Sequence, residues 1–222
     1  MQENAIMIGS RKAAINKDIR QKFCIHCRNV IATIPHILLS CGITKKRQVE
    51  RHDYISKEIY KAILKQYCKY EDVDENITYL PKCITTNENL IIIMANKNVI
   101  AANGTDSYAR RPDIYLENRK EKKGYIIDTT IVADENISRA YIKKVAKYWT
   151  LQEIVRRERE MKYVRIIPVV ITINGFIHKK SVAELKKELG IELKYGEIIK
   201  NLLIKEMKDL MYYVTNENPT YK

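Results

Sequence analysis

Four potential metal ligands lie close together near the start of the chain. Cys24 and Cys27 are followed by His36 and Cys41, which gives the pattern C-x2-C-x8-H-x4-C. Zinc in proteins is usually held by four Cys or His side chains in a tetrahedron, and two close pairs can enclose one ion around a short loop. The spacing predicts a small zinc knuckle in which His26, between the two cysteines, takes no part.

The alternative interpretation of the cysteines is that they are reduced thiols packing as small apolar side chains. That interpretation is the better one for Cys68 and Cys83, which lie outside the pattern. The first residues, Met1–Asn4, are polar and predict no signal peptide. No stretch approaches the roughly 20 apolar residues of a membrane span. Free cysteines without a secretory signal indicate a reducing compartment.

The chain is strongly basic, with a formal net charge of +13 over 222 residues. A positive charge of this size favours a polyanionic partner such as nucleic acid. The chain is also rich in Lys, Asn, Ile and Tyr, which A/T-rich codons encode, so codon composition is another source of part of the charge. The length suits one medium domain with a small appended module.

Hydrophobic periodicity predicts a layered α/β fold. A helix is expected over 50–68, then an acidic, Asn-rich connector over 71–89. Apolar runs predict four strands, the last of them central in the sheet, at 90–94, from 114, at 125–132 and at 164–173.

A long helix is predicted between the last two strands, from Ser138 as its N-cap to Met161. Its buried stripe is expected to consist of Ile142, Val145, Ala146 and Trp149. Two more helices are expected within 179–214, divided near Gly190. The predicted segments are a helical leader (1–23), the knuckle (24–49), an α/β core (50–178) and C-terminal helices with a tail (179–222).

Two acidic residues stand out by their positions. Asp113 begins a predicted strand and Asp128 ends the apolar run of the next, with fourteen residues between them. A hairpin of that length can bring both carboxylates to one edge of a sheet, where they can bind Mg²⁺ for phosphodiester hydrolysis. The alternative is that Asp113 caps a strand or turn and Asp128 forms a surface ion pair.

Further motifs follow the knuckle in a fixed order: Arg51-His52-Asp53, Arg111-Pro112-Asp113, Ile127-Asp128 and Lys144-x3-Tyr148. Together they resemble the C-terminal region of site-specific non-LTR retrotransposon proteins, whose endonuclease is restriction-like. The resemblance covers roughly residues 20–178 and includes the stretches RPDIYL, YIIDTTI, KYWTLQEI and VRIIPVVI.

The resemblance implies a PD-(D/E)xK-type fold, a mixed sheet flanked by helices, with Asp113 and Asp128 as Mg²⁺ ligands. In common restriction enzymes a lysine stands two residues after the second acid, but here that residue is Thr130. In the retrotransposon version the lysine comes from the following helix, which implies that Lys144 and Tyr148 complete the site.

Other residues are weaker candidates. A second Lys-x3-Tyr match occurs at Lys208 and Tyr212, and only the position after Asp128 selects the first; Lys143 and Lys147 are the neighbours that would replace Lys144. Nucleic-acid contacts are expected from Arg51, His52 and Arg111. The alternatives are a surface role for Arg111 and a helix-start cap or a pair with Asp53 for His52.

These expectations describe a Mg²⁺-dependent DNA endonuclease domain with a structural Zn²⁺, nicking double-stranded target DNA in the nucleus to prime reverse transcription. Element RNA is a further expected partner, and no membrane or small-molecule cofactor is expected. Residues 1–23 are too few to hold the reverse transcriptase of a complete element, which suggests a truncated copy. The alternatives are a zinc-dependent nucleic-acid-binding remnant or domesticated protein with an inactive nuclease, and an unrelated repair or recombination nuclease.

Overall fold

The computed structural model shows two compact units joined by a continuous chain. It describes residues 22–68, 83–85, 91–95, 99 and 111–217. The sheet unit comprises Tyr54–Thr172 and Phe176–Lys194, and the knuckle unit comprises the chain up to Asp53, residues 173–175 and the chain from Tyr195. Helix α3 (Lys45–Cys68) begins in the knuckle unit and continues into the sheet unit.

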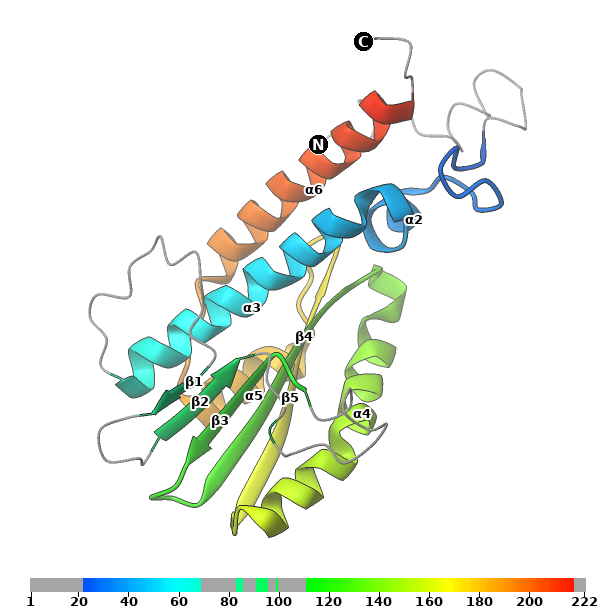
Figure 1. Ribbon diagram of the computed structural model, residues 1–222. Helices are drawn as coiled ribbons and strands as arrows, with labels where there is room; N and C mark the ends of the chain where they lie inside the picture. Colours follow the sequence, from blue (N-terminus) through cyan, green and yellow to red (C-terminus); the bar gives the residue numbers. More distant parts are fainter. Residues whose placement is uncertain (1–21, 69–82, 86–90, 96–98, 100–110, 218–222) are drawn as a thin grey trace. The chain divides into compact units, whose positions relative to one another are not determined.

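The described residues form a sheet of five strands in the order of the chain (Figure 1): β1 (Cys83–Thr85), β2 (Ile91–Ala95), β3 (Ile114–Asn118), β4 (Lys123–Val132) and β5 (Tyr163–Thr172). Neighbouring strands are antiparallel except β4 and β5, which are parallel. Parallel neighbours need a long crossover, and helix α4 (Ile137–Glu158) provides it. The predicted fold class, a mixed sheet flanked by helices with a small Cys/His module, is confirmed.

Helix α4 covers one face of the sheet with Tyr141, Tyr148, Leu151 and Val155, which are buried. The predicted stripe is only partly correct: Val145 packs against the core, but Ile142 is 67% exposed and Trp149 61% exposed. The predicted cap was also wrong: Ser138 lies inside the first turn, and the N-cap is Asn136, after the short 3-10 helix η4 (Asp134–Asn136).

The opposite face of the sheet is covered by α3 residues of the same unit. The Ser56 hydroxyl on α3 donates to the Thr129 hydroxyl at 3.0 Å, whereas Tyr148 on α4 donates to Asp128, the preceding residue of β4. Because successive strand residues point to opposite faces, α3 and α4 lie on opposite sides of β4. Helix α3 begins five residues before the predicted start at 50, and β1 lies inside the segment predicted to be a connector.

Strand β5 is an edge strand of the described sheet, not the central strand that was predicted. Several of its outer backbone groups nevertheless have hydrogen-bond partners. Ser181 of α5 (Lys179–Leu189) donates to the Pro168 carbonyl at 2.6 Å and accepts from the Val170 N–H at 3.3 Å. The Gln152 amide donates to the Val164 carbonyl at 2.6 Å, and the His178 N–H donates to the Val170 carbonyl at 3.0 Å.

The knuckle unit contains α2 (Ile34–Leu39), the 3-10 helix η2 (Gly42–Thr44), the first part of α3 and α6 (Tyr195–Glu217). The units divide the chain differently from the predicted segments: α6 belongs with the knuckle, and α5 belongs with the sheet. Most of the predicted helical leader lies outside the described residues. Among the helices that are described, none is both long and apolar enough to cross a membrane.

Candidate functional site

The four predicted zinc ligands come together in the knuckle unit. One ligand atom from each of Cys24, Cys27, His36 and Cys41 lies within 4.8 Å of all the others. The Cys41 sulfur is 3.6 Å from that of Cys24 and 3.8 Å from that of Cys27. Tetrahedral zinc with Zn–S bonds of about 2.3 Å places its sulfur ligands about 3.8 Å apart, so the cluster matches a zinc site in size.

The imidazole of His36 is oriented as a zinc ligand. Thr33 caps α2 by accepting a hydrogen bond from the His36 backbone N–H, which fixes this residue in the first turn. The Nδ1 atom lies 3.1 Å from the Ser40 hydroxyl, and Nε2 is buried without a hydrogen-bond partner among the described residues. A ligand that uses one ring nitrogen for the metal and the other for a supporting polar group is common in metal sites. The residues present therefore fit zinc.

Burial and hydrogen bonds give the two buried thiols of the cluster, Cys24 and Cys41, different pKa values. Burial raises the pKa of Cys24, but hydrogen bonds, the largest from the Tyr213 hydroxyl, outweigh it and lower the pKa to about 6. For Cys41, burial raises the pKa to about 12. A bound cation would favour both thiolates. His26 takes no part, as predicted from its position; its ring packs edge-on against Tyr213 at 5.6 Å between centroids.

A second cluster lies in the sheet unit, where two strands bring Asp113 and Asp128 to the same end of the sheet. Ile114 pairs with Ile127, so Asp113, just before β3, and Asp128, one residue beyond Ile127, are neighbours in register. The Thr129 N–H donates to Asp113 Oδ2 at 2.7 Å, and the Ser56 hydroxyl approaches the same oxygen at 3.4 Å. Sequence analysis missed Ser56 and Thr129, whose polar side chains carry no motif.

Asp128 is the centre of this cluster. It is 3% exposed, and Lys144 Nζ donates to its Oδ2 while the Tyr148 hydroxyl donates to its Oδ1. Lys144 also donates to the Thr129 carbonyl at 3.3 Å, and Lys147 Nζ is 3.8 Å from Asp128 Oδ1. Lys144 and Tyr148 share a helix face because they are one turn apart. The structure thus brings together Asp128, Lys144 and Tyr148, and adds Lys147.

The donor chemistry of this cluster fits Mg²⁺. Mg²⁺ prefers oxygen ligands and is often held by one or two carboxylates with substrate phosphate completing its shell. Asp113 and Asp128 belong to neighbouring strands, and their carboxylates have different partners: Asp113 accepts from the Thr129 N–H and lies 3.4 Å from the Ser56 hydroxyl of α3, whereas Asp128 accepts from Lys144 and Tyr148 of α4. The Lys144 ammonium holds a positive charge against Asp128 Oδ2. A divalent ion at Asp128 would replace that ammonium.

The three residues predicted to contact nucleic acid lie in different environments. Arg111 is exposed, so its side chain stays a candidate phosphate contact. Its backbone carbonyl lies 3.3 Å from the Tyr148 hydroxyl, which places the residue beside the Asp128 cluster. The prediction for Arg51 was wrong: the side chain is 1% exposed, forms an ion pair with Asp209 and donates to the Leu38 carbonyl. His52 Nδ1 lies 3.1 Å from Asp53 Oδ1, so His52 forms the pair with Asp53 that was given as the alternative to a nucleic-acid contact.

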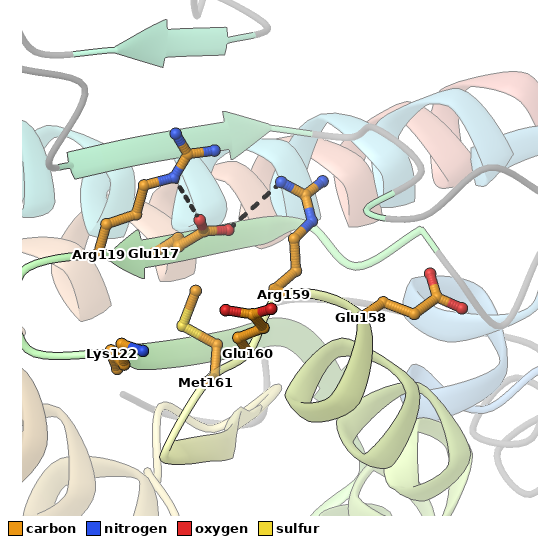
Figure 2. A pocket seen from close by; sticks show the side chains of 7 residues that line it. All are labelled: Glu117, Arg119, Lys122, Glu158, Arg159, Glu160 and Met161. Carbon is orange, nitrogen blue, oxygen red and sulfur yellow. Dashed lines mark hydrogen bonds and ion pairs between the residues drawn. The ribbon is translucent and has the colours of Figure 1, made fainter.

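A separate pocket lies near the β3–β4 hairpin and the end of α4 (Figure 2). Its buried acid, Glu117, accepts hydrogen bonds from Arg119 Nε at 2.8 Å and from the Tyr115 hydroxyl at 3.1 Å, and Arg159 lies 3.5 Å away. Both carboxylate oxygens are therefore engaged by protein groups. The other lining residues are Lys122, Glu158, Glu160 and Met161, so acidic and basic groups balance and the pocket offers no clear charge preference to a ligand.

Neither a protein-family model nor a curated protein matches the chain. Among solved structures, it is similar to a cap-snatching endonuclease of Toscana virus, with 15% identity and a TM-score of 0.35 over 54% of each chain. It is also similar to a cap-snatching endonuclease of the Phenuiviridae, with 14% identity and a TM-score of 0.35 over 55% of this chain and 52% of the other. The match thus spans about half the length of these proteins.

Proposed function

We propose that this chain is a metal-dependent endonuclease that cleaves phosphodiester bonds in double-stranded DNA at the Asp128 cluster. The observation that carries the proposal is the convergence of a buried carboxylate with Lys144, Lys147 and Tyr148, beside Asp113 at the same end of the sheet. Carboxylates with an adjacent lysine at a sheet edge are the groups that phosphodiester hydrolysis needs.

In the proposed reaction, the oxygen of a water molecule forms a bond to phosphorus, and the bond from phosphorus to one bridging oxygen breaks. The water loses a proton, and the leaving oxygen gains one. Bound Mg²⁺ would supply positive charge to the phosphate. Asp113 and Asp128 would hold that ion, while the Tyr148 hydroxyl and the Thr129 N–H keep the two carboxylates in place. A lysine ammonium stabilises negative charge that develops on the phosphate oxygens.

The finer parts of the proposal rest on the sequence. The formal charge of +13 and the exposed Arg111 favour a nucleic-acid substrate. The ordered motifs support a role as the nuclease part of a non-LTR retrotransposon protein that nicks chromosomal target DNA in the nucleus to prime reverse transcription. Zinc held by the knuckle would have a structural role, because a closed set of four protein ligands leaves no open position for a substrate.

A second candidate function is a zinc-dependent nucleic-acid-binding protein with an inactive nuclease. The observation in its favour is that both oxygens of Asp128 accept hydrogen bonds from protein groups. A carboxylate engaged in this way binds a metal only if a protein donor gives way.

Nicking of supercoiled plasmid in Mg²⁺ distinguishes the two functions. The parent should produce nicked circles, and Asp113→Ala or Asp128→Ala should not, because each change removes one of two metal ligands. DNA affinity, measured by fluorescence anisotropy, should change little because phosphate contacts from Lys and Arg dominate it. Lys208→Ala, in the second Lys-x3-Tyr match on α6, is the matched control and should nick plasmid as the parent does. Equal nicking by the parent and by a variant that carries both Asp113→Ala and Asp128→Ala would refute the assignment of the site.

A further inference from the structure

The two lysines beside Asp128 have different surroundings. Lys144 Nζ donates to Asp128 Oδ2 and lies 3.3 Å from the carbonyl of Thr129. Both acceptors belong to consecutive residues of β4, so this ammonium is bound to the strand itself. It lies where a cation that used Asp128 Oδ2 as a ligand would have to bind.

Lys147, by contrast, contacts the side chain of Tyr148. Its Nζ donates to the Tyr148 hydroxyl at 2.7 Å and lies 4.5 Å from the centroid of the Tyr148 ring. It lies 3.8 Å from Asp128 Oδ1, within ion-pair range but beyond hydrogen-bonding distance. Cation–π and hydrogen-bond contacts to one tyrosine hold this ammonium near the carboxylate without using the carboxylate as its main partner.

We propose that the two lysines have different roles in the proposed active site. Lys144 is a positioning residue that holds Asp128 and competes with the metal for Oδ2. Lys147 is the catalytic cation, which contacts a non-bridging oxygen of the scissile phosphate. The assignment rests on the proposed nuclease function, and it makes Lys147 the catalytic lysine in place of Lys144, three residues earlier on α4, which the family resemblance implies.

Electrostatics favours this division. A divalent ion at Asp128 repels an ammonium bound to the same oxygen, so Lys144 must withdraw when the metal binds. Lys147 has the Tyr148 ring as a further partner, 4.5 Å from its Nζ, and this cation–π contact remains when a metal binds Asp128. Both lysines are partly exposed, at 22% and 25% of their side-chain surface, so each can reach a phosphate at the mouth of the site.

Two measurements on the whole chain test the proposal: calorimetric titration with Mn²⁺ alone, and plasmid nicking in Mg²⁺. Lys144→Met should bind Mn²⁺ roughly tenfold more tightly than the parent, the coupling expected when one of two charges in contact is removed. Lys147→Met should tighten Mn²⁺ binding by less than Lys144→Met does, because the Lys147 ammonium lies 3.8 Å from Asp128 Oδ1 and is not hydrogen-bonded to it. The control Lys208→Met should stay within about twofold of the parent.

In nicking, Lys147→Met should lower kcat by about a hundredfold with little change in KM, the signature of a group that acts in the transition state. Lys147→Arg should recover part of that loss, because it restores the charge. Parental kcat in Lys147→Met would overturn the catalytic role, and unchanged or weaker Mn²⁺ binding by Lys144→Met would overturn the competition. A parent that does not nick plasmid in Mg²⁺ would refute the nuclease function and the role of Lys147 with it, while the titration would still decide the role of Lys144.

Discussion

Replacing Tyr148 by phenylalanine isolates the hydrogen bonds of one hydroxyl at the Asp128 cluster. Tyr148 is fully buried, and its ring belongs to the core that α4 forms with the sheet. The substitution keeps that ring and removes the donor to Asp128 Oδ1 and the acceptor for Lys147. The change therefore tests whether the cluster stabilises the fold as well as the proposed chemistry.

The expected magnitude follows from the charge on Asp128. A hydrogen bond to a charged group contributes about 1.5–3 kcal/mol, and its loss leaves a buried carboxylate with fewer donors. Lys144 still neutralises Asp128, so we expect about 2 kcal/mol less free energy of unfolding. That difference corresponds to a roughly thirtyfold larger ratio of unfolded to folded protein, and to a midpoint lower by about 1 M urea.

Urea unfolding followed by far-UV circular dichroism and by the fluorescence of Trp149, the single tryptophan, measures this difference. Tyr195→Phe is the matched control, because the Tyr195 hydroxyl is buried and has no hydrogen-bond partner in the part of the chain that the structure describes. Its removal should leave the midpoint unchanged or raise it slightly. If Tyr148→Phe unfolds at the same urea concentration as Tyr195→Phe, the Asp128 network does not stabilise the fold.

Three further predictions concern the knuckle unit. Protein purified without chelator should contain one zinc per chain by atomic emission, and Cys41→Ser should lose it while Cys68→Ser keeps it. Burial raises the pKa of Glu206 from 4.5 to about 8, so the folded state keeps a proton that the unfolded state has lost. The free energy of unfolding should therefore fall as pH rises from about 4.5 to about 8, by up to about 1.4 kcal/mol per pH unit, and Glu206→Gln should flatten the curve. Arg51→Ala should lower the free energy of unfolding by about 3 kcal/mol, because Asp209 would stay buried without its main partner.

The residues whose proximity in space could be predicted are close together in the sequence. The knuckle ligands lie within 18 residues of one another, and Lys144 and Tyr148 lie one turn apart on a helix whose existence the pattern predicts. The burial of Arg51 depends on Asp209, 158 residues further along the chain, so a basic residue in a charged stretch was taken for a surface contact.

The orientation of α4 was mispredicted for a related reason. Hydrophobicity favours burial of Ile142 and Trp149, but the helix buries Tyr141 and Tyr148 instead. Each of these tyrosines donates to a buried acid, Glu184 or Asp128, that lies on another element. A phenol can be buried when its hydroxyl has a partner, and the sequence of the helix alone does not reveal that partner.

The occupied outer edge of β5 affects how the protein behaves at high concentration. An apolar ten-residue edge strand with unpaired amides is a template on which a second chain can add a strand and start aggregation. Here Ser181, Gln152 and the backbone of His178 engage that edge, and Pro168 has no N–H to offer. These residues lie outside the proposed chemistry, and they occupy backbone groups that a strand of a second molecule would need for pairing.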